Sequence, residues 1–314
     1  MPISMNILSV EQFDKDYLAE LFKLAAEFEE KLKNPQAAKA LAEKHTGKQL
    51  CTLFYEPSTR TRLSFETAAL KLGMGVVSTE NAGGFSSAAK GETLEDSINV
   101  INQYGVSAIV IRHPEVGSAE KAAKVSKVPI VNAGDGKGEH PTQALLDAYT
   151  IYKQFGRLDN LHVVAGGDLK YGRTIRSLCR LLALYPNNKI TFVSLPKLQM
   201  QDDIKDLLKK SGTEFSETAD IKQAFPSADV VYWTRLQKER LEKADKFDNG
   251  GFIIDKSNID LLPKNAIILH PLPRVDEINP EVDSDPRARY FEQSGNGLYI
   301  RMALLDQIAS KEEA

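Results

Sequence analysis

The sequence has 314 residues, of which 42% are hydrophobic and 26% charged, and its formal net charge is −3 at pH 7. This length suits two domains of roughly 150 residues each, and the composition is typical of a globular chain that buries a core. An acidic balance gives no general attraction to nucleic acid or to an anionic membrane surface. Neither is therefore expected as a partner, and any basic site has to be local.

The N-terminal segment contains no basic stretch followed by an apolar one, and no apolar run approaches the roughly 18 residues that span a bilayer. We therefore expect a cytoplasmic protein that has no membrane anchor. The two cysteines, Cys51 and Cys179, lie far apart and form no CxxC motif. This spacing predicts reduced core residues, with neither a disulfide framework nor a metal site.

Short apolar runs rich in β-branched residues alternate with longer helical patterns along most of the chain, which is typical of parallel βαβ units. In the first half, the predicted strands are 50–55, 75–78, 108–112 and 129–132. In the second half, they are 161–165, 189–194, 229–234 and 266–269. The predicted fold class is therefore α/β, with two domains that each contain a parallel sheet flanked by helices.

The predicted helices indicate how the chain is divided. They lie at 58–73, along HPTQALLDAYTIYKQFG from Pro141, at 174–184 and, after a turn in SGNG, at 298–308. Pro141 suits the first position of a helix, and this long helix is expected to connect the domains. The first domain is predicted to comprise 1–140, with a C-terminal helix in 296–314 packing back on it, and the second to comprise 141–295.

The segment FYEPSTRTRLSFETAALKLG, residues 54–73, follows a buried strand and opens a helix with a serine, two threonines and two arginines. Its first helical turn has free backbone amides that point at one place beyond the strand, from Ser58, Thr59, Arg60 and Thr61. Helix N-termini bind phosphate through such amides, and a bound anion would offset positive charge that the helix dipole disfavours. The segment therefore predicts a phosphate site, and a helix capped by Ser58 with two solvated arginines is the alternative.

Three further loops of the first half carry candidate groups. Arg112 ends a strand in IRHP, and His140 and Gln143 follow the next strand in NAGDGKGEHPTQ. Because ligands of open α/β sheets bind beyond the carboxyl ends of strands, these groups are expected to converge with the helix start. The loop FSSAAKGET carries Ser86 and Lys90, and Lys90 taken alone predicts a solvated surface lysine.

The second half presents different groups at its strand ends. Arg173 follows a glycine-rich turn after one strand, and Arg235 follows another, with Gln237 two positions further on. Two arginines suit two carboxylates, because guanidinium groups bind carboxylates through paired hydrogen bonds. The prolines of HPLP, residues 270–273, fix backbone carbonyls that can accept from an amine. Each feature alone is more typical of a structural role, but their common placement indicates a second site.

These motifs resemble, in their order and spacing, those of the catalytic chains of aspartate carbamoyltransferases over nearly the whole chain. They are STRTR at 58–62, KGET at 90–93, RHP at 112–114, HPTQ at 140–143, GDLKYGRT at 167–174, TRLQ at 234–237 and HPLPR at 270–274. STRTR is common to carbamoyltransferases, whereas HPLP and the pair of Arg235 and Gln237 favour the aspartate enzyme. The HCLP and DxxxSMG motifs of the ornithine enzyme do not occur in the sequence.

The resemblance implies that carbamoyl phosphate binds in the first domain before L-aspartate binds in the second, giving N-carbamoyl-L-aspartate and phosphate in de novo pyrimidine biosynthesis. His140, with Thr61 and Arg112, would bind the carbamoyl oxygen and stabilise the oxyanion as the amine attacks. Gln143 would orient the carbamoyl nitrogen, together with the carbonyls of Pro271 and Leu272. The phosphate itself would be held by Ser58, Thr59, Arg60, Thr61 and Arg112.

The resemblance also assigns the aspartate site and the assembly. Arg173, Arg235 and Gln237 would bind the aspartate carboxylates, and Glu56 would pair with both arginines when the domains close. Ser86 and Lys90 would come from a neighbouring subunit to contact the substrates, so the active unit would be a homotrimer with shared sites and Lys90 would be catalytic. Many members also assemble, as dodecamers, with a zinc-bearing regulatory chain, and the sequence leaves that partner open. No metal or organic cofactor would be required, because the phosphate leaving group can itself accept the proton.

Two alternatives stay open at this point. The first is a carbamoyltransferase for another amine, such as ornithine, putrescine or N-acetylornithine. The second is a catalytically silent phosphate-binding module with the same fold. Loss of Lys90, His140 or Arg235 would mark the silent module, and the sequence retains all three.

Overall fold

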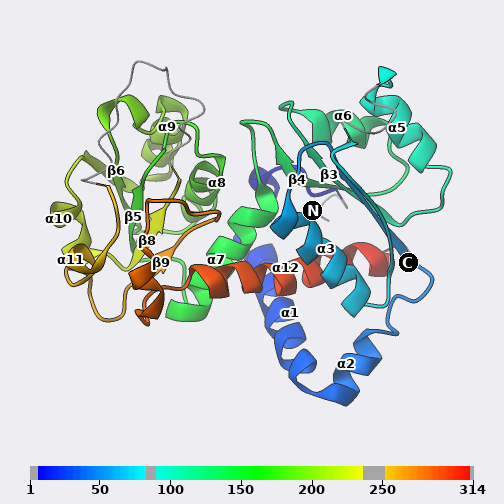
Figure 1. Cartoon of the computed structure of the whole chain (residues 1–314), viewed down its shortest axis with the longest axis horizontal. Helices are drawn as coiled ribbons and strands as arrows, with labels where there is room; N and C mark the ends of the chain where they lie inside the picture. Colours follow the sequence, from blue (N-terminus) through cyan, green and yellow to red (C-terminus); the bar gives the residue numbers. More distant parts are fainter. Residues whose placement is uncertain (1–5, 83–89, 236–251, 312–314) are drawn as a thin grey trace. The chain divides into compact units, whose positions relative to one another are not determined.

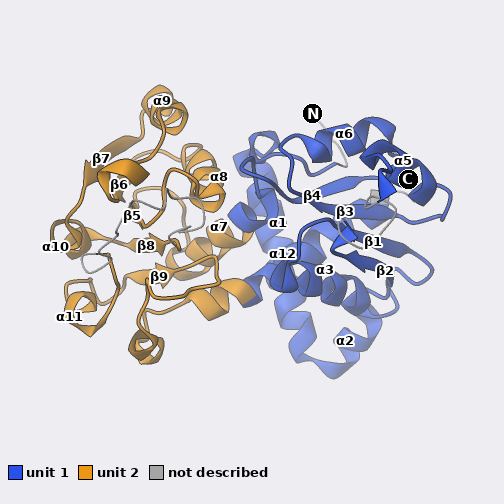
Figure 2. Ribbon diagram, turned by 45° about the horizontal axis from the view of Figure 1, so that its top comes forward, with its two compact units in different colours: residues 1–145, 295–314 blue, residues 146–294 orange. Residues whose placement is uncertain are grey.

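The computed structural model describes residues 6–82, 90–235 and 252–311 (Figure 1). The chain forms two compact units, unit 1 with residues 1–145 and 295–314, and unit 2 with residues 146–294 (Figure 2). Two helices, α7 (Pro141–Phe155) and α12 (Tyr290–Lys311), have residues in both units. The chain therefore passes from one unit to the other within a helix each time.

Unit 1 contains, within the described residues, a four-stranded parallel sheet with the order β2-β1-β3-β4. Its elements up to α7 are η1 (Val10–Gln12), α1 (Lys15–Lys33), α2 (Pro35–Leu41), β1 (Gln49–Phe54), α3 (Thr59–Lys71), β2 (Gly75–Glu80), α5 (Leu94–Ile101), β3 (Ala108–His113), α6 (Ser118–Val125) and β4 (Ile130–Asp135). These strands confirm the four predicted in the first half, with small shifts at their ends.

The position of a strand in this sheet explains its hydrophobic pattern. In β1, which lies between two other strands, every residue after Gln49 is buried, as expected where helices cover both faces of a parallel sheet. In β2, at the edge, no residue is fully buried. Helix α3 buries Phe65 and Ala69, and Leu72 is buried directly after it; the guanidinium carbon of Arg301 in α12 lies 4.9 Å from the centre of the Phe65 ring.

Unit 2 contains a five-stranded parallel sheet with the order β7-β6-β5-β8-β9. Its elements between α7 and α12 are β5 (His162–Gly166), α8 (Arg173–Leu182), β6 (Lys189–Val193), η3 (Pro196–Leu198), α9 (Asp202–Ser211), β7 (Glu214–Thr218), α10 (Ile221–Ala224), η4 (Phe225–Ser227), β8 (Val230–Trp233), α11 (Lys256–Ile259), β9 (Ile267–Leu269) and η6 (Pro280–Ser284). Each half of the chain thus has its own parallel sheet, as predicted from the sequence.

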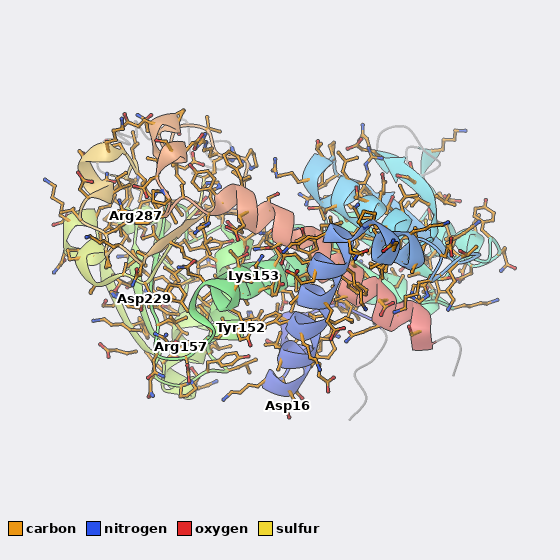
Figure 3. All side chains as sticks on the ribbon, turned by 90° about the horizontal axis from the view of Figure 1, so that it is seen from below. Asp16, Tyr152, Lys153, Arg157, Asp229 and Arg287 are labelled. Carbon is orange, nitrogen blue, oxygen red and sulfur yellow. The ribbon has the colours of Figure 1, made fainter. Side chains whose placement is uncertain are left out.

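Within unit 2, α7 and α12 contact each other through polar side chains. The carboxylate of Asp147, which is fully buried, accepts from Gln293 at 2.6 Å and from the hydroxyl of Tyr232 at 2.8 Å. Lys153, labelled on α7 in Figure 3, forms an ion pair with Glu292 at 3.8 Å. These contacts hold the two connecting helices against β8.

Two expectations from the sequence are wrong. β7 was not expected, because its sequence EFSET is largely polar and its residues are half-exposed or exposed at the sheet edge. The SGNG segment is not a turn: α12 runs from Tyr290 through Gly295 and Gly297, so it begins eight residues before the predicted start at 298. Tyr290 and Asn296 are buried, and this packing outweighs the low helix propensity of glycine.

Two further observations concern the length and apolarity of the helices and the state of the cysteines. In the parts of the chain that the structure describes, no helix is both long enough and apolar enough to cross a membrane. Cys51 and Cys179 are buried and form no disulfide, and burial raises the pKa of Cys51 to about 11 and that of Cys179 to about 12. Both are therefore core residues, as predicted, and their raised pKa values make them poorly reactive thiols.

Candidate active site

The start of α3 lies beyond the carboxyl end of β1. Ser58 occupies the N-cap position with extended backbone angles (φ −155°, ψ 91°), but its hydroxyl makes no capping hydrogen bond. The amides of the first turn have no acceptors within the helix, as at any helix N-terminus. The sequence alternative of a helix capped by Ser58 is therefore wrong in its hydrogen bonding. Amides and hydroxyls at this place are instead available to an anion.

Two arginines add positive charge at the same edge of the sheet. Arg112 lies near the end of β3, in register with Phe54 of β1. Burial lowers the pKa of Arg112, Glu56 opposes this effect, and the nearby charge of Arg60 adds to it. Burial also lowers the pKa of Arg60. Neighbouring cations whose pKa values are lowered in this way favour a bound anion, which is the ligand that the sequence predicts here.

Glu56 lies in the turn between β1 and α3. Its Oε2 atom is 3.6 Å from Nε of Arg112, which makes a loose ion pair. This carboxylate partly neutralises Arg112 at a distance too long for a direct hydrogen bond. Glu56 is thus placed beside the predicted phosphate ligands of unit 1.

His140 directly precedes α7 and Gln143 lies in its first turn, both within unit 1. His140 is 4% exposed and Gln143 is 9% exposed. They follow β4, which neighbours β3, and β3 neighbours β1. The sheet order therefore brings the candidate groups that follow β1, β3 and β4 to one edge of the sheet.

Two carboxylates that the sequence analysis missed fix the loop before His140. The carboxylate of Asp135 accepts from the N–H of Gly117 at 2.9 Å and from that of Glu139 at 2.7 Å. Glu139 accepts from the hydroxyl of Ser9 at 2.9 Å and from the N–H of Val10 at 2.7 Å. The signal for this role was the GDGKGE segment, whose glycines and acidic residues are typical of a tight, hydrogen-bonded loop.

Lys90 lies on the surface of unit 1. Its side chain is exposed, three residues before Thr93, whose hydroxyl caps α5 by accepting from the N–H of Asp96 at 3.1 Å. Its exposure within one chain agrees with the prediction of a surface lysine. Ser86, the other candidate of this loop, lies outside the described residues.

In unit 2, the loops after β5, β8 and β9 begin at the same sheet edge, because these three strands are neighbours. Arg173 is the first residue of α8, and Arg235 follows β8 by two residues. Thr234 joins the two loops, since its hydroxyl and its N–H both donate to the carbonyl of Gly166, at 3.0 and 2.9 Å. Both arginines are partly buried. Gln237 lies outside the described residues.

The glycine-rich turn after β5 has a structural explanation. Gly167 has φ +95°, and a Cβ at this position would lie 2.1 Å from the carbonyl oxygen of Thr234. A residue without a side chain is required where the two loops approach this closely. Gly167 therefore serves loop packing.

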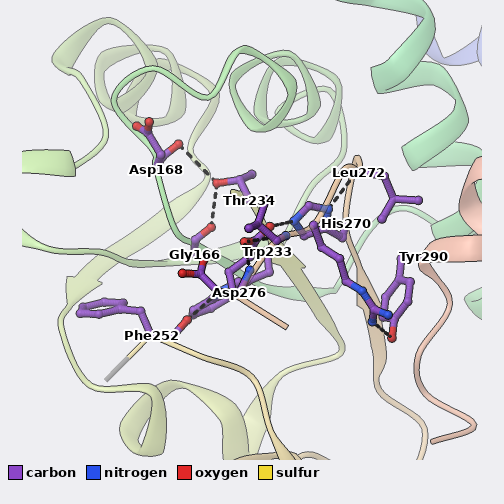
Figure 4. Close-up of polar contacts among 12 residues, drawn as sticks. Gly166, Asp168, Trp233, Thr234, Phe252, His270, Leu272, Asp276 and Tyr290 are labelled. Carbon is purple, nitrogen blue, oxygen red and sulfur yellow. Dashed lines mark hydrogen bonds and ion pairs between the residues drawn. The ribbon is translucent and has the colours of Figure 1, made fainter. Parts of the chain in front are cut away.

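The HPLP segment after β9 holds an unusual backbone. Leu272 has φ +54°, a left-handed conformation that costs a non-glycine residue about 1–2 kcal/mol, and the Leu272–Pro273 peptide is cis. The N–H of Leu272 donates to Nδ1 of His270 at 2.8 Å (Figure 4). Pro271 and Leu272 are partly exposed, whereas His270 is buried. The two carbonyls named from the sequence thus belong to a segment that a buried side chain holds in place.

No metal centre is evident in the described part of the chain. Among those residues, no group of three or more His, Cys, Asp or Glu side chains is placed to hold a metal ion. The groups that the described residues offer for chemistry are backbone amides, hydroxyls, arginines, the buried His140 and the HPLP carbonyls.

Comparison with protein families matches the chain in two parts. Residues 5–153 match the family described as the carbamoyl-P binding domain of aspartate/ornithine carbamoyltransferase, and residues 159–308 match the Asp/Orn binding domain of the same enzymes. A relative from Oryza sativa subsp. japonica, named aspartate carbamoyltransferase, chloroplastic, is 51% identical over 96% of this chain and 84% of its own length. The aspartate carbamoyltransferase catalytic subunit of Vibrio cholerae is 43% identical over 96% of this chain and 95% of its own.

Solved structures agree with these relatives. The catalytic subunit of M. jannaschii aspartate transcarbamoylase superposes with a TM-score of 0.91 at 42% identity, covering 99% of this chain and all of that one. Aspartate transcarbamoylase from Trypanosoma cruzi, in complex with carbamoyl aspartate and phosphate, superposes with a TM-score of 0.86 at 38% identity, over 96% of this chain and 94% of that one.

The chain belongs to the aspartate/ornithine carbamoyltransferase family. Both matched domains are those of this family, and the fold predicted from the sequence is confirmed. Within the family, the chain is similar over nearly its whole length to catalytic chains of aspartate carbamoyltransferases, so the resemblance drawn from the motifs is confirmed as well.

Proposed function

We propose that the chain is an aspartate carbamoyltransferase that transfers the carbamoyl group of carbamoyl phosphate to the amino group of L-aspartate. The observation that carries this assignment is the anion site at the start of α3, with Arg112 at the adjacent strand end, in a chain 51% identical to a named aspartate carbamoyltransferase. The products are N-carbamoyl-L-aspartate and phosphate. A cell would use the first as a precursor in pyrimidine biosynthesis.

Unit 1 binds carbamoyl phosphate. The phosphate lies against the first turn of α3, where main-chain amides, hydroxyls and guanidinium groups stabilise its charge. Thr61, Arg112 and His140 contact the carbamoyl oxygen and stabilise the oxyanion of the tetrahedral intermediate. The phosphate ligands are Ser58, Thr59, Arg60, Thr61 and Arg112.

Unit 2 binds L-aspartate through Arg173, Arg235 and Gln237. The unprotonated amine attacks the carbamoyl carbon, forming the new C–N bond, and the C–O bond to phosphate then breaks. The departing phosphate accepts the proton that the amine loses. Gln143 and the carbonyls of Pro271 and Leu272 orient the carbamoyl nitrogen and the amine, which lowers the barrier by positioning. Glu56 exchanges its contact with Arg112 for Arg173 and Arg235 when aspartate binds.

The active assembly is a homotrimer in which Ser86 and Lys90 act in the site of a neighbouring subunit. Large apolar side chains on the surface of unit 1 support association: Leu63 and Leu70 of α3 are 49% and 60% exposed, and Val77 of the edge strand β2 is 45% exposed. Lys90 is exposed on the same unit. A mixture of Lys90→Ala and His140→Ala chains should regain activity, because some mixed trimers contain an intact site. Mixed trimers with no activity would contradict shared sites.

We also propose a cellular compartment for the chain and a measurement of its assembly. The relatives from rice and Arabidopsis thaliana are named chloroplastic, whereas we place this chain in the cytoplasm, where its two free, buried cysteines stay reduced. Cell fractionation tests this. Native mass measurement distinguishes a trimer from a dodecamer with a zinc-bearing regulatory chain.

An amine-specificity assay tests the function. The purified chain is incubated with carbamoyl phosphate and, in parallel, L-aspartate, ornithine, putrescine or N-acetylornithine. We expect N-carbamoyl-L-aspartate and phosphate in equal amounts. Preference for another amine would identify a different carbamoyltransferase, and no turnover with any amine at saturation would indicate a silent module.

A further inference from the structure

His270 belongs to the HPLP motif, yet none of the roles above uses its side chain. The imidazole is 1% exposed, directly after β9, and both ring nitrogens have partners. Nδ1 accepts from the N–H of Leu272 at 2.8 Å, and Nε2 lies 2.8 Å from Oε1 of Glu277. Figure 4 shows the first of these bonds joining His270 to the Leu272 backbone.

These partners determine which nitrogen of His270 carries the proton. A backbone N–H can only donate, so Nδ1 has to be an acceptor without a proton. In the neutral ring, Nε2 therefore carries the proton and donates it to the carboxylate of Glu277. His270 is thus a neutral residue with one defined tautomer.

Glu277 joins the two ends of the segment that begins at His270. Its carboxylate is 3% exposed, and its second oxygen, Oε2, accepts from the N–H groups of Val275 and Asp276, both at 3.2 Å. Each of its oxygens accepts hydrogen bonds, one from His270 and the other from two backbone amides, as an ionised carboxylate does. One ionised carboxylate therefore holds both the start and the end of the segment 270–276.

The backbone of His270 is held as firmly as its ring. Its N–H donates to Oε1 of Gln293 at 2.8 Å, and the amide nitrogen of Gln293 donates to Asp147 at 2.6 Å. Asp147 also accepts from Tyr232, so β8, α7 and α12 all contribute to the position of His270. The ring is accordingly fixed, and the point that it fixes in turn is the left-handed Leu272.

We propose that Glu277 is a positioning residue for carbamoyl transfer: through His270, it holds Pro271 and Leu272 in the conformation that directs their carbonyls at the carbamoyl nitrogen and the amine. The inference rests on the function proposed above. A buried pair that served packing alone would not need one oxygen for the imidazole and the other for two backbone amides. Nor would it need an imidazole nitrogen to accept from the residue with the strained backbone.

Kinetics of Glu277→Ala test the proposal. A displacement of about 1 Å at a reacting group lowers the rate roughly 100-fold, so kcat should fall by about that factor. The affinity for inorganic phosphate, whose ligands are in unit 1, should not change. The matched control is His45→Ala, since His45 is also buried and bonds to a carboxylate, that of Asp306, at 2.7 Å. This control should lower stability and leave kcat unchanged.

Two results would overturn the proposal. One is a folded Glu277→Ala chain with the kcat of the wild type. The other is a loss of kcat that phosphate affinity follows in proportion, since this would indicate general damage. If the wild type itself turns over neither carbamoyl phosphate nor aspartate, the proposed function fails instead.

A conservative pair of variants separates position from packing. In His270→Asn, the amide oxygen takes the place of Nδ1 and can accept from the N–H of Leu272, whereas His270→Ala removes this acceptor. We expect His270→Asn to retain more of kcat than His270→Ala. Equal kcat values in the two variants would contradict a role through Leu272.

The tautomer of His270 can also be measured in the wild-type protein, which does not depend on a variant that folds. The chain contains five histidines, and nitrogen NMR of a histidine-labelled sample reports the protonation of each ring nitrogen. We expect Nδ1 of His270 to be unprotonated and Nε2 to be protonated. The signals of His270 are identified by comparison with His270→Asn if that variant folds, and by through-bond assignment if it does not. The opposite tautomer would overturn the proposal, whether or not the chain shows activity.

Discussion

The two units present binding groups at the carboxyl edge of a parallel sheet, but they fix these groups by different means. Unit 1 gathers donors, with main-chain amides of α3 and two arginines whose pKa values burial lowers. Unit 2 holds acceptors in place, with a backbone segment whose conformation a neutral histidine and an ionised glutamate maintain. The first arrangement is electrostatically costly until an anion binds. The second is satisfied by the protein itself.

The difference shows that a binding group can be held in place by hydrogen bonds within the protein, as in unit 2, and need not be an unsatisfied charge, as in unit 1. In unit 1, the proposed function and stability oppose each other, because a desolvated cation such as Arg112 destabilises the folded chain, although it would bind the proposed anion. In unit 2, the same hydrogen bonds serve both the fold and the position of the HPLP carbonyls. Variants should therefore affect activity and stability in different proportions in the two units.

The largest expected effect separates activity from stability in unit 1. Arg112→Met removes a charge from the proposed oxyanion and phosphate site, so kcat should fall about 10²–10³-fold. Because burial lowers the pKa of Arg112, its cation is not favoured by the fold, and we expect no loss of thermal stability. Assay and thermal unfolding measure the two effects.

The matched control for Arg112 lies in unit 2. Arg287 is similarly buried, but hydrogen bonding to Asp285 raises its pKa. Arg287→Met should lower the melting temperature and leave kcat intact. If both variants lost stability and activity in equal measure, the contrast between the units would not hold.

Next in size is a steric effect in unit 2. Gly167→Ala would place a Cβ 2.1 Å from the carbonyl oxygen of Thr234 and would require a left-handed alanine at φ +95°. We expect a loss of about 3 kcal/mol in the free energy of unfolding, from backbone strain and the displaced loop. The fluorescence of Trp233, the single tryptophan of the chain, follows unfolding in urea.

The control for this variant is a glycine with open surroundings. Gly105 has φ +70°, and a Cβ added there would meet no atom within 4 Å, so Gly105→Ala should cost only about 1 kcal/mol. Equal losses at Gly167 and Gly105 would show that the close approach to Thr234 contributes nothing.

A smaller effect on stability and kcat is expected from a substitution in the loop before His140. In Asp135→Asn, one oxygen that accepts from the N–H of Gly117 or Glu139 becomes an NH₂ group, so one buried amide loses its acceptor. We expect about 2 kcal/mol lower stability and a lower kcat, because His140 is less well held. The exposed Asp206, which pairs with Lys209 at 3.3 Å, gives the control Asp206→Asn, with little effect on either quantity. A normal kcat in Asp135→Asn would remove the positioning role.

The smallest expected effect is a pH dependence in unit 2. Hydrogen bonds from Arg274 and Arg287 lower the pKa of Asp283 and Asp285 below the ordinary value of 3.8. A lowered pKa means that the folded chain binds fewer protons than the unfolded chain, so this stability is present above about pH 4 and lost as pH falls through the folded pKa. Urea unfolding followed by Trp233 should show it, and Asp283→Asn should reduce the slope. A slope that Asp283→Asn left unchanged would argue against this origin.

Much of the fold could be predicted from the hydrophobic pattern of the sequence, and the elements that this pattern missed have physical explanations. Buried strands such as β1 and β5 consist mainly of apolar residues, so their composition locates them. β7 escapes because an edge strand needs few apolar residues, and the first turns of α12 escape because packing around Tyr290 compensates for two glycines.

The site residues also fall into two groups, those that the sequence indicates and those that only the folded structure reveals. Arginines, hydroxyls and His140 could be named as candidates from the sequence, because their chemistry shows in the residue type. Asp135, Glu139 and Glu277 were not, since they act on backbone amides or on another side chain, and only the folded geometry reveals those partners. Side chains that hold other groups in place carry no signal in composition or spacing.

The course of α12 sets the order in which the units can be completed during synthesis. Every residue of unit 2 has been translated once residue 294 is added, whereas unit 1 needs the rest of α12, up to the residues that bury Phe65 and His45. Unit 1, which contains the residues translated first, is therefore the unit whose residues are completed last. A chain that stopped before Arg301 would contain all of unit 2 but lack the side chains that contact Phe65 and His45 in unit 1.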